Sequence, residues 1–308
     1  MTETAAARGH DSRYGYGVAC LLTATLFTST AGIILRLIEQ ADGWQVLFYR
    51  SVSFVAVLLG YIAIRQRGQT LQAFRAVGGP GLVVAVALAT AFATFILALR
   101  ETTVANVVFI TGTTPFFAAL FAWLALREPV RPAVWLAMAV AFCGLVIMLG
   151  GGLARGTMTG NLLALTCCLC FAVTLVAMRR GKAVDMLPAV CLAGVLVALV
   201  SAAMVESFRI SAHDLALAVI LGVVQLGFQY ILVTAGSRHV PAAEIALIGR
   251  TVMVLGPLWV WIGVGEVPSQ ATLIGGAIVL AAVLGQAFWS LRPGAAARRN
   301  NGCPVGPS

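Results

Sequence analysis

The chain has 308 residues, of which 60% are hydrophobic and only 10% are charged, and its mean hydropathy is +0.98. These values exclude an ordinary soluble protein, in which about 25% of residues are charged. The formal net charge of +9 would suit a nucleic-acid-binding protein, but in a membrane protein its meaning depends on which loops carry the Lys and Arg residues. The composition therefore predicts an all-α integral membrane protein.

Apolar stretches recur along the chain from the first to the last predicted span. A membrane-spanning helix needs about 20 mostly apolar residues. Ten spans fit the sequence, at residues 15–38, 43–64, 77–99, 103–126, 132–150, 159–179, 187–206, 214–236, 241–264 and 270–290. Residues 1–14 form a short segment before the first span, which is too long for a secretory signal and is expected to stay. Residues 292–308 form a basic tail rich in Gly, Pro and Asn, which is expected to be disordered.

The Lys and Arg residues of the loops alternate between the two sides of the membrane. Fourteen lie on the side of the N-terminus, against four on the other side, namely Arg36, Arg100, Arg155 and Arg209. Loops rich in Lys and Arg stay in the cytoplasm, so both termini are predicted to be cytoplasmic. The tail then faces membrane lipid, and a nucleic-acid partner is not expected.

Three of the seven cysteines, Cys167, Cys168 and Cys170, include a C-x-x-C spacing. They lie inside a predicted span and no clustered histidines accompany them, so we interpret them as small apolar packing residues. Cys303 lies in the tail. No metal and no cofactor is expected.

Two parts of the sequence repeat each other. An offset of 138 residues aligns Glu128 with Glu266 and Trp123 with Trp261, and gives six identities in 26 positions without a gap. An offset of 143 aligns Arg36 with Arg179 in the first span of each half. Each half has five predicted spans, and an odd number inverts the second half relative to the first, as in many secondary transporters.

Each copy of the repeated segment carries a glycine and a proline, but at different places. Pro115 follows Gly112 in the fourth span, and Pro257 follows Gly256 in the ninth. Proline removes a backbone donor and glycine adds backbone freedom, so these residues are candidate hinges. The alternative is that both residue types are simply common in transmembrane helices.

The runs PFFAALFAWLALRE, ending at Glu128, and GPLWVWIGVGE, ending at Glu266, resemble the EamA-type members of the drug/metabolite transporter superfamily. Arg50 in FYRS and Glu244 in PAAE also match residues often found in such proteins, whereas Arg127 departs from the usual glycine. The resemblance covers residues 15–150 as a first repeat and 159–291 as a second. It implies helices around a central cavity and export of small metabolites, often amino acids and including aromatic ones, across the bacterial inner membrane by alternating access.

Arg50 and Arg250 lie well inside predicted spans, where a charged side chain costs at least about 2.5–3.5 kcal/mol. For Arg250, near the membrane midplane, an anchor for a substrate carboxylate and a clamp between helices are equally good interpretations. For Arg50, nearer a membrane surface, the sequence favours the clamp. Both are candidate substrate-binding residues.

Glu244 opens the ninth span. A carboxyl group there could bind and release a proton and so couple transport to a pH gradient. The alternative, which the sequence favours, is that Glu244 complements the helix dipole.

Other polar and aromatic residues are candidates for the wall of a cavity, with hydrogen bonding or packing between helices as the alternative. The polar candidates are Asn106, Thr111, Thr113, Thr114, Gln225, Gln229 and Tyr230, and the aromatic candidates are Phe27, Phe92, Phe171, Phe228 and Trp259. Gly275, Gly276 and Gly285 on the tenth span could support close packing within one chain or in a homodimer.

Other functions fit the sequence less well than a secondary transporter. An intramembrane enzyme needs a nucleophile with a base or a metal cluster, and the histidines His10, His213 and His239 all lie outside the spans or at their edges. The short loops leave no room for the ligand domain of a receptor. An ATP-driven pump is not indicated, because the sequence has no Walker-type glycine loop.

Overall fold

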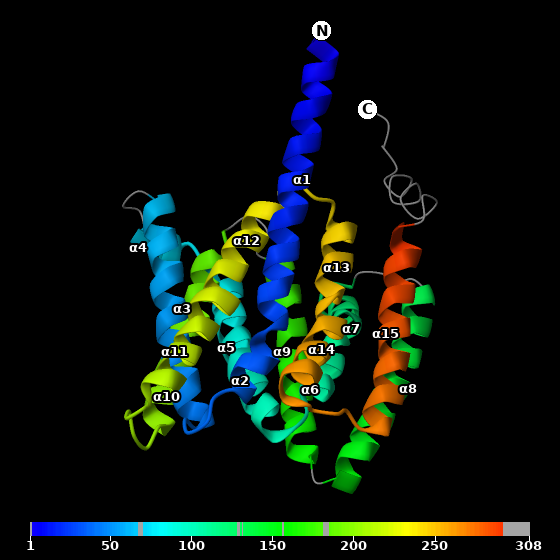
Figure 1. The fold of residues 1–308 in the computed structure, drawn as a ribbon. Coiled ribbons are helices and arrows are strands. Elements are labelled where there is room, and N and C mark those ends of the chain that lie inside the picture. Colours follow the sequence, from blue (N-terminus) through cyan, green and yellow to red (C-terminus); the bar gives the residue numbers. More distant parts are fainter. Residues whose placement is uncertain are drawn as a thin grey trace.

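A computed structural model describes residues 2–66, 70–127, 130, 132–155, 157–180 and 185–291. All regular structure within these residues is helical, which confirms the predicted fold class. The helices pack side by side and run between two ends of the molecule, and the start of α1 and the end of α15 lie toward the same end (Figure 1). Glu128, Cys303 and the predicted tail of residues 292–308 lie outside the described residues.

The first half of the chain forms the helices of the first predicted repeat. They are α1 (Thr2–Ser29), α2 (Ala31–Arg36), α3 (Gly43–Gln66), α4 (Thr70–Arg75), α5 (Gly78–Glu101), α6 (Val104–Gly112), α7 (Thr114–Leu126) and α8 (Pro132–Arg155). The second half forms α9 (Met158–Arg180), α10 (Leu187–Met204), α11 (Ala212–Ile220), the π-helix η1 (Leu221–Phe228), α12 (Gln229–Gly236), α13 (Ala242–Arg250), α14 (Val252–Val264) and α15 (Gln270–Leu291).

Nine helical segments of the described residues are long and apolar enough to cross a membrane, from Tyr14–Arg36 to Leu247–Val264. In α15, the segment Gln270–Gln286 is also apolar but shorter. The predicted spans agree closely with these helices; residues 43–64, for example, correspond to Gly43–Gln66. The count of ten spans stays a prediction.

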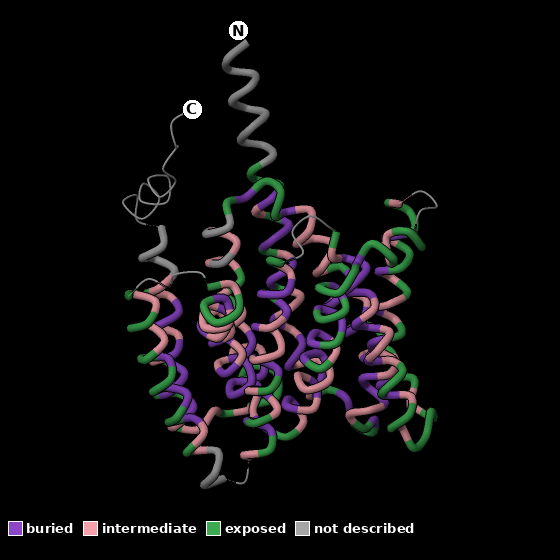
Figure 2. The backbone as a smooth tube through the Cα atoms, turned by 180° about the vertical axis from the view of Figure 1, so that it is seen from behind, coloured by how far each residue is buried: buried purple, intermediate pink, exposed green. Residues whose placement is uncertain are grey.

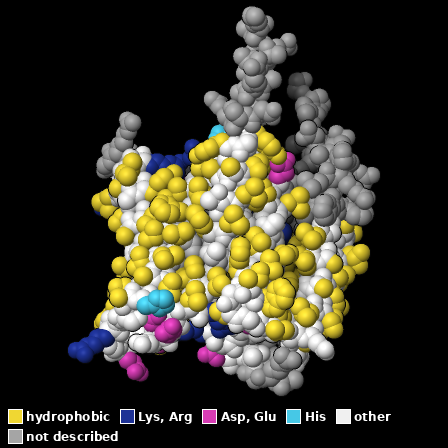
Figure 3. All heavy atoms as spheres, viewed as in Figure 1, with side chains coloured by type: hydrophobic (Ala, Val, Ile, Leu, Met, Phe, Trp, Pro, Cys, Tyr) yellow, Lys and Arg dark blue, Asp and Glu magenta, His cyan; other side chains and the backbone are white. Residues whose placement is uncertain are grey.

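The surface seen in Figure 3 carries apolar side chains over its middle, with most of its charged groups toward the two ends. Buried stretches run along the inward sides of the helices (Figure 2). A large apolar cluster, which includes Leu47, Phe54, Ile96 and Leu145, joins helices of both repeats. The outer surface suits lipid, and the core holds the two halves together.

The backbone reproduces the internal repeat of the sequence. The offset of 138 residues that aligns Glu128 with Glu266 converts the bounds of α6 and α7 into those of α13 and α14. The fourth and ninth spans are therefore each broken once, at Thr113 and at Thr251. The break in the ninth span is not at its proline, since Pro257 lies inside α14 without ending it.

Contacts between the repeats also occur at corresponding positions of the two halves. Gly17 of α1 packs against the loop before α13, where a Cβ on Gly17 would lie 2.8 Å from the Cβ of His239. Gly160 of α9, its counterpart at the offset of 143, packs against the loop before α6, where a Cβ would lie 2.7 Å from the Cβ of Thr102. Each first span thus meets the loop before the broken helix of the other repeat.

The glycines of α15 pack within the chain. A Cβ on Gly275 would lie 2.5 Å from the carbonyl oxygen of Gly144 in α8, and one on Gly276 would lie 2.5 Å from the Phe109 ring. Nothing lies within 4 Å of a Cβ built on Gly285. Two of the three glycines therefore serve close helix packing inside one chain.

Candidate functional site in a cavity between the two repeats

A cavity of about 300 Å³ lies between helices of both repeats. The helices α1, α2, α3, α5, α6 and α9 line it together with η1, α12, α13 and α14. The predicted site residues that line it are Arg50, Thr111, Gln225, Gln229, Tyr230 and Arg250, with the candidate hinge residues Gly112 and Gly256. A volume of this size suits a small metabolite.

Arg50 of α3 is fully buried, with 1% of its surface exposed. Its Nη2 donates to Gln225 Oε1 at 3.4 Å, which is long for a hydrogen bond. Its Nε and Nη1 have no hydrogen-bond partner among the described residues. The Phe92 ring lies 5.7 Å from its Cζ. A clamp between helices would engage the guanidinium with several acceptors, and the described residues supply only Gln225.

Arg250 approaches the same cavity from the second repeat. It is the last residue of α13 and lies directly before the break at Thr251. Its Nε is buried and has no hydrogen-bond partner among the described residues. Gly112, which ends α6 before the break at Thr113, occupies the equivalent position of the first repeat and also lines the cavity. Both breaks therefore adjoin the cavity.

Neutral polar groups and aromatic rings complete the wall. Thr111 Oγ1 donates to the carbonyl of Val107 at 2.7 Å, which leaves its oxygen able to accept. The rings of Phe92 and Tyr230 lie 6.4 Å apart between centroids. Phe95 and Phe171 line the same space. The cavity thus has a largely apolar wall of aromatic rings beside its two arginines.

Several predicted wall residues are not among the residues that line the cavity. Thr114 Oγ1 donates to the carbonyl of Thr111 at 2.5 Å. Trp259 Nε1 donates to Ser29 Oγ at 2.9 Å, so Trp259 lies behind the wall. Phe228 is largely exposed at the outer surface. Phe27 is not among the residues that line the cavity.

Asn106 belongs to a buried polar cluster rather than to the cavity wall. Its Nδ2 donates to Thr102 Oγ1 at 3.0 Å and to Asn161 Oδ1 at 2.9 Å, and its Oδ1 accepts from Thr272 Oγ1 at 2.5 Å. These partners belong to α9, α15 and the loop before α6. The alternative of hydrogen bonding between helices describes Asn106 better than a site in the wall.

Glu244 also lies away from the cavity, in the first turn of α13. Its Oε2 accepts a hydrogen bond of 2.5 Å from the hydroxyl of Tyr14 on α1. A carboxylate in this position complements the helix dipole.

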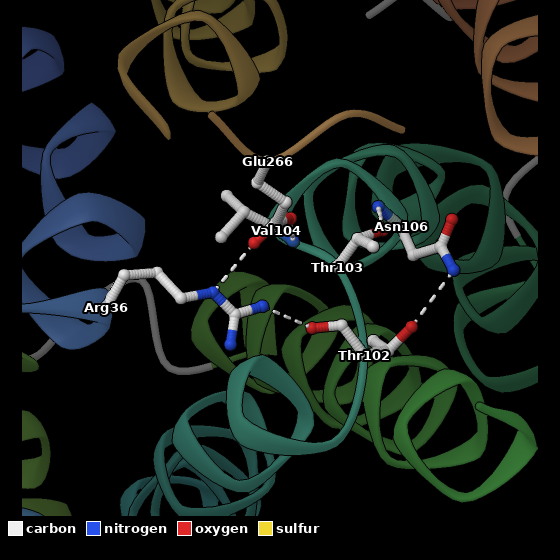
Figure 4. A network of polar contacts seen from close by, with 6 residues as sticks. All are labelled: Arg36, Thr102, Thr103, Val104, Asn106 and Glu266. Carbon is white, nitrogen blue, oxygen red and sulfur yellow. Dashed lines mark hydrogen bonds and ion pairs between the residues drawn. The ribbon is translucent and has the colours of Figure 1, made fainter. Parts of the chain in front are cut away.

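A polar network lies toward the end of the helix bundle opposite the N-terminus, and Figure 4 shows its contacts. Arg36 Nε forms an ion pair of 2.7 Å with Glu266 Oε2, and Arg36 Nη2 donates to the carbonyl of Thr102 at 2.7 Å. Glu266 Oε1 accepts from the backbone N–H of Val104 at 2.8 Å. Arg36 and Val104 come from the first repeat and Glu266 from the second, so the network joins the two halves.

The sequence did not assign a role to this network. A signal for it was present in the repeat, which aligns Arg36 with Arg179 and Glu266 with Glu128. An acidic and a basic residue at corresponding positions of two inverted repeats are candidates to pair across them. Val104 and Gly32 line the cavity, so the network lies directly beyond one end of the site.

The cysteines of α9 are packed inside the bundle. Cys167 and Cys168 are fully buried. The sulfur of Cys168 lies 3.3 Å from Thr113 Oγ1 at the break between α6 and α7. The described residues contain no group of three or more His, Cys, Asp or Glu side chains that could hold a metal ion.

Comparison with known proteins places these features in a family. The chain matches the EamA-like transporter family over residues 15–150 and 158–287. The crystal structure of another protein aligns with this chain at 22% sequence identity and a TM-score of 0.64. The alignment covers 90% of this chain and 98% of the other. This likeness shows a shared fold. No curated protein matches the chain.

The family match covers both halves of the chain and confirms, at the level of the family, the resemblance seen in the segments that end at Glu128 and Glu266. Its two matched ranges coincide with the two sets of helices that surround the cavity. The chain belongs to the EamA-like transporter family.

Proposed function

We propose that this protein is a secondary transporter that exports small carboxylate-bearing metabolites across the inner membrane of a bacterium. Amino acids, including aromatic ones, are the class that the sequence resemblance implies. The observation that supports the proposal most is the cavity between the repeats, where Arg50 has a buried guanidinium with two nitrogens that find no partner among the described residues. A guanidinium offers paired donors to a planar carboxylate.

Alternating access is supported by the positions of the helix breaks. Gly112 and Arg250 end the first segments of the two broken spans, occupy equivalent positions in the repeats and line the cavity. Broken helices at a substrate site are typical of transporters with inverted repeats. Small changes of backbone angle at Thr113 and Thr251 would move α7 and α14 relative to the site.

The proposed direction of transport is the export that the family resemblance implies, and the predicted orientation of the chain is compatible with it. The excess of Lys and Arg on the side of the termini favours a cytoplasmic location for that end. The Arg36–Glu266 network then lies toward the outer surface, beyond the end of the cavity that Val104 lines, and its contacts between the repeats support a form that receives substrate from the cytoplasm.

The test is uptake of labelled amino acids and other small carboxylates by liposomes that contain the purified protein. Arg50→Gln is expected to lower uptake roughly 10- to 100-fold, since a hydrogen bond to a charged group contributes about 1.5–3 kcal/mol. Arg65→Gln is the matched control on α3, because Arg65 forms a half-exposed ion pair with Asp185 away from the cavity. Folded protein that moves none of these compounds would contradict the proposed substrate class.

Glu244 is the proposed proton-coupling group, with the helix dipole as the alternative. Coupling predicts faster uptake under an imposed pH gradient and loss of that stimulation in Glu244→Gln. The Tyr14→Phe variant removes the hydrogen bond to Glu244 and leaves the carboxyl group in place. Uptake that does not respond to a pH gradient would leave Glu244 with a structural role only.

A further inference from the structure

The charge of the cavity wall is unbalanced. Its lining contains two cationic side chains, Arg50 and Arg250, one from each repeat. No Asp or Glu of the described residues lines it. The acidic side chains nearest in the sequence to these arginines are held elsewhere, because Asp42 accepts from the backbone of Gln45 and Glu244 from Tyr14.

The excess positive charge is poorly compensated by the protein. Arg50 keeps Nε and Nη1 without a partner, and Arg250 keeps Nε without one, within the described part of the chain. A buried charge without a partner is costly, so a ligand that supplies acceptors to these nitrogens contributes stabilisation that the described side chains do not supply. The unpartnered donors therefore point to an anionic ligand.

A ligand ammonium finds no carboxylate among the described residues that line this cavity. Its possible acceptors are neutral oxygens such as Thr111 Oγ1 and the amide oxygens of Gln225 and Gln229, and Gln225 Oε1 already faces Arg50. At low dielectric, repulsion between an ammonium and two guanidinium groups is strong. The binding of a zwitterion would be strengthened by its carboxylate and weakened by its ammonium group.

We infer that the cavity binds net-anionic compounds in preference to zwitterionic amino acids of the same shape. The preferred compounds are carboxylates with an apolar body about the size of an aromatic ring and with no free ammonium group. The inference rests on the proposed function and narrows its substrate class. The rings of Phe92, Phe95, Phe171 and Tyr230 supply the apolar wall for the body of such a compound.

Matched probes test this preference directly. L-Phenylalanine, 3-phenylpropionate and 2-phenylethylamine share a phenylethyl body and differ in their charged groups, and phenylsuccinate adds a second carboxylate. Affinities for the purified protein at pH 7 would be measured by calorimetry, and transport by uptake into liposomes. We expect 3-phenylpropionate to bind at least 10-fold more tightly than phenylalanine, phenylsuccinate at least as tightly as 3-phenylpropionate, and phenylethylamine most weakly.

The outcomes separate the inference from the proposed function. If phenylalanine is transported and binds as tightly as 3-phenylpropionate or more tightly, the inference is wrong and the proposed function stands. If none of the three carboxylates binds or is transported, the proposed substrate class fails with it.

Variants locate the preference in the cavity. Arg50→Gln and Arg250→Gln are each expected to bring the affinity ratio of 3-phenylpropionate to phenylalanine closer to one, whereas Arg65→Gln keeps it. Should an arginine variant not fold, Gln229→Glu adds a carboxylate to the wall at a neutral position. That variant is expected to shift the ratio at least 10-fold toward phenylalanine, and an unchanged ratio would overturn the inference.

Discussion

At the residue scale, the ends of α7 and α14 show how the same backbone is built from different residues. The helix is followed by Gly265 with φ of 68° in the second repeat and by Arg127 with φ of 53° in the first. Both angles are left-handed, a conformation that costs a residue other than glycine roughly 1–2 kcal/mol. The sequence shows Arg127 as a departure from the glycine usual in this motif, and the structure shows that its backbone keeps the conformation that glycine favours.

Substitutions of Arg127 and Gly265 are expected to have opposite effects on stability. Arg127→Gly relieves the left-handed strain, so we expect it to raise the thermal midpoint in detergent, with a gain in stability of about 1 kcal/mol. Gly265→Ala adds the same strain and should lower the midpoint. Thermal unfolding followed by fluorescence or circular dichroism measures both. A lower midpoint for Arg127→Gly would show that the Arg127 side chain stabilises the fold by more than its backbone costs.

At the element scale, the π-helix η1 positions the polar wall of the cavity. π-Helical segments are rare and occur often at functional sites. Here the segment carries Gln225 and leads into Gln229 and Tyr230, and all three line the cavity. Gly222 lets η1 approach α3 closely, since a Cβ there would lie 1.9 Å from Ser53 Oγ and 2.2 Å from the carbonyl oxygen of Arg50.

Gly222→Ala is expected to separate η1 from α3, because the carbonyl oxygen of Arg50 belongs to the backbone of a packed helix. The shift would weaken the contact between Gln225 and Arg50, and it should lower both the thermal midpoint and substrate affinity. Gly60→Ala is the matched control on α3, where an added Cβ meets nothing within 4 Å. Equal behaviour of the two variants would show that η1 adjusts without moving the site.

At the scale of the whole molecule, the two repeats meet through the Arg36–Glu266 network. It lies beyond the end of the cavity that Val104 lines, and the internal repeat aligns Arg36 with Arg179 and Glu266 with Glu128 in the sequence. Arg36 and Glu266 are partly exposed, with 26% and 18% of their side chains accessible. Breaking the pair is therefore expected to cost little stability and to act mainly on the opening of this end of the cavity.

Arg36→Gln and Glu266→Gln are expected to open this end of the cavity. In a protein without native cysteines that carries Thr111→Cys, labelling by an impermeant thiol reagent from the side opposite the N-terminus should accelerate roughly 5-fold for about 1 kcal/mol of lost interaction. The double exchange of Arg36→Glu with Glu266→Arg should restore slow labelling in part, because the bond from the Val104 N–H to Glu266 is not recovered. Unchanged labelling in all variants would show that the network does not gate the site.

Much of the fold could be predicted because it follows from the lengths of the apolar segments and from the internal repeat of the sequence. The predicted span at 103–126 corresponds to α6 and α7, and the offset of 138 appears in the backbone as equal segments on both sides of Thr113 and Thr251. The break of the ninth span lies at Thr251 and not at Pro257, because a helix packed in a bundle accommodates a proline. Bending at the candidate hinge residues stays a prediction.

The cavity wall was only partly predictable. Arg50, Gln225 and Gln229 line the cavity, whereas the equally polar Asn106 and Thr114 are held by neighbours. Polarity inside a span indicates that a group needs a partner, but sequence does not say whether the partner is a ligand or another helix.

The sequence by itself determined the membrane class, the helical spans, the repeat and the family motif, because these depend on local hydrophobicity and on similarity along the chain. Only the tertiary structure decided which polar groups face the cavity, that Arg50 has no partner for its Nε and Nη1 among the described residues, and that Arg36 pairs with Glu266. These depend on contacts between residues far apart in the sequence, and such contacts are set by how the helices rotate and pack against one another.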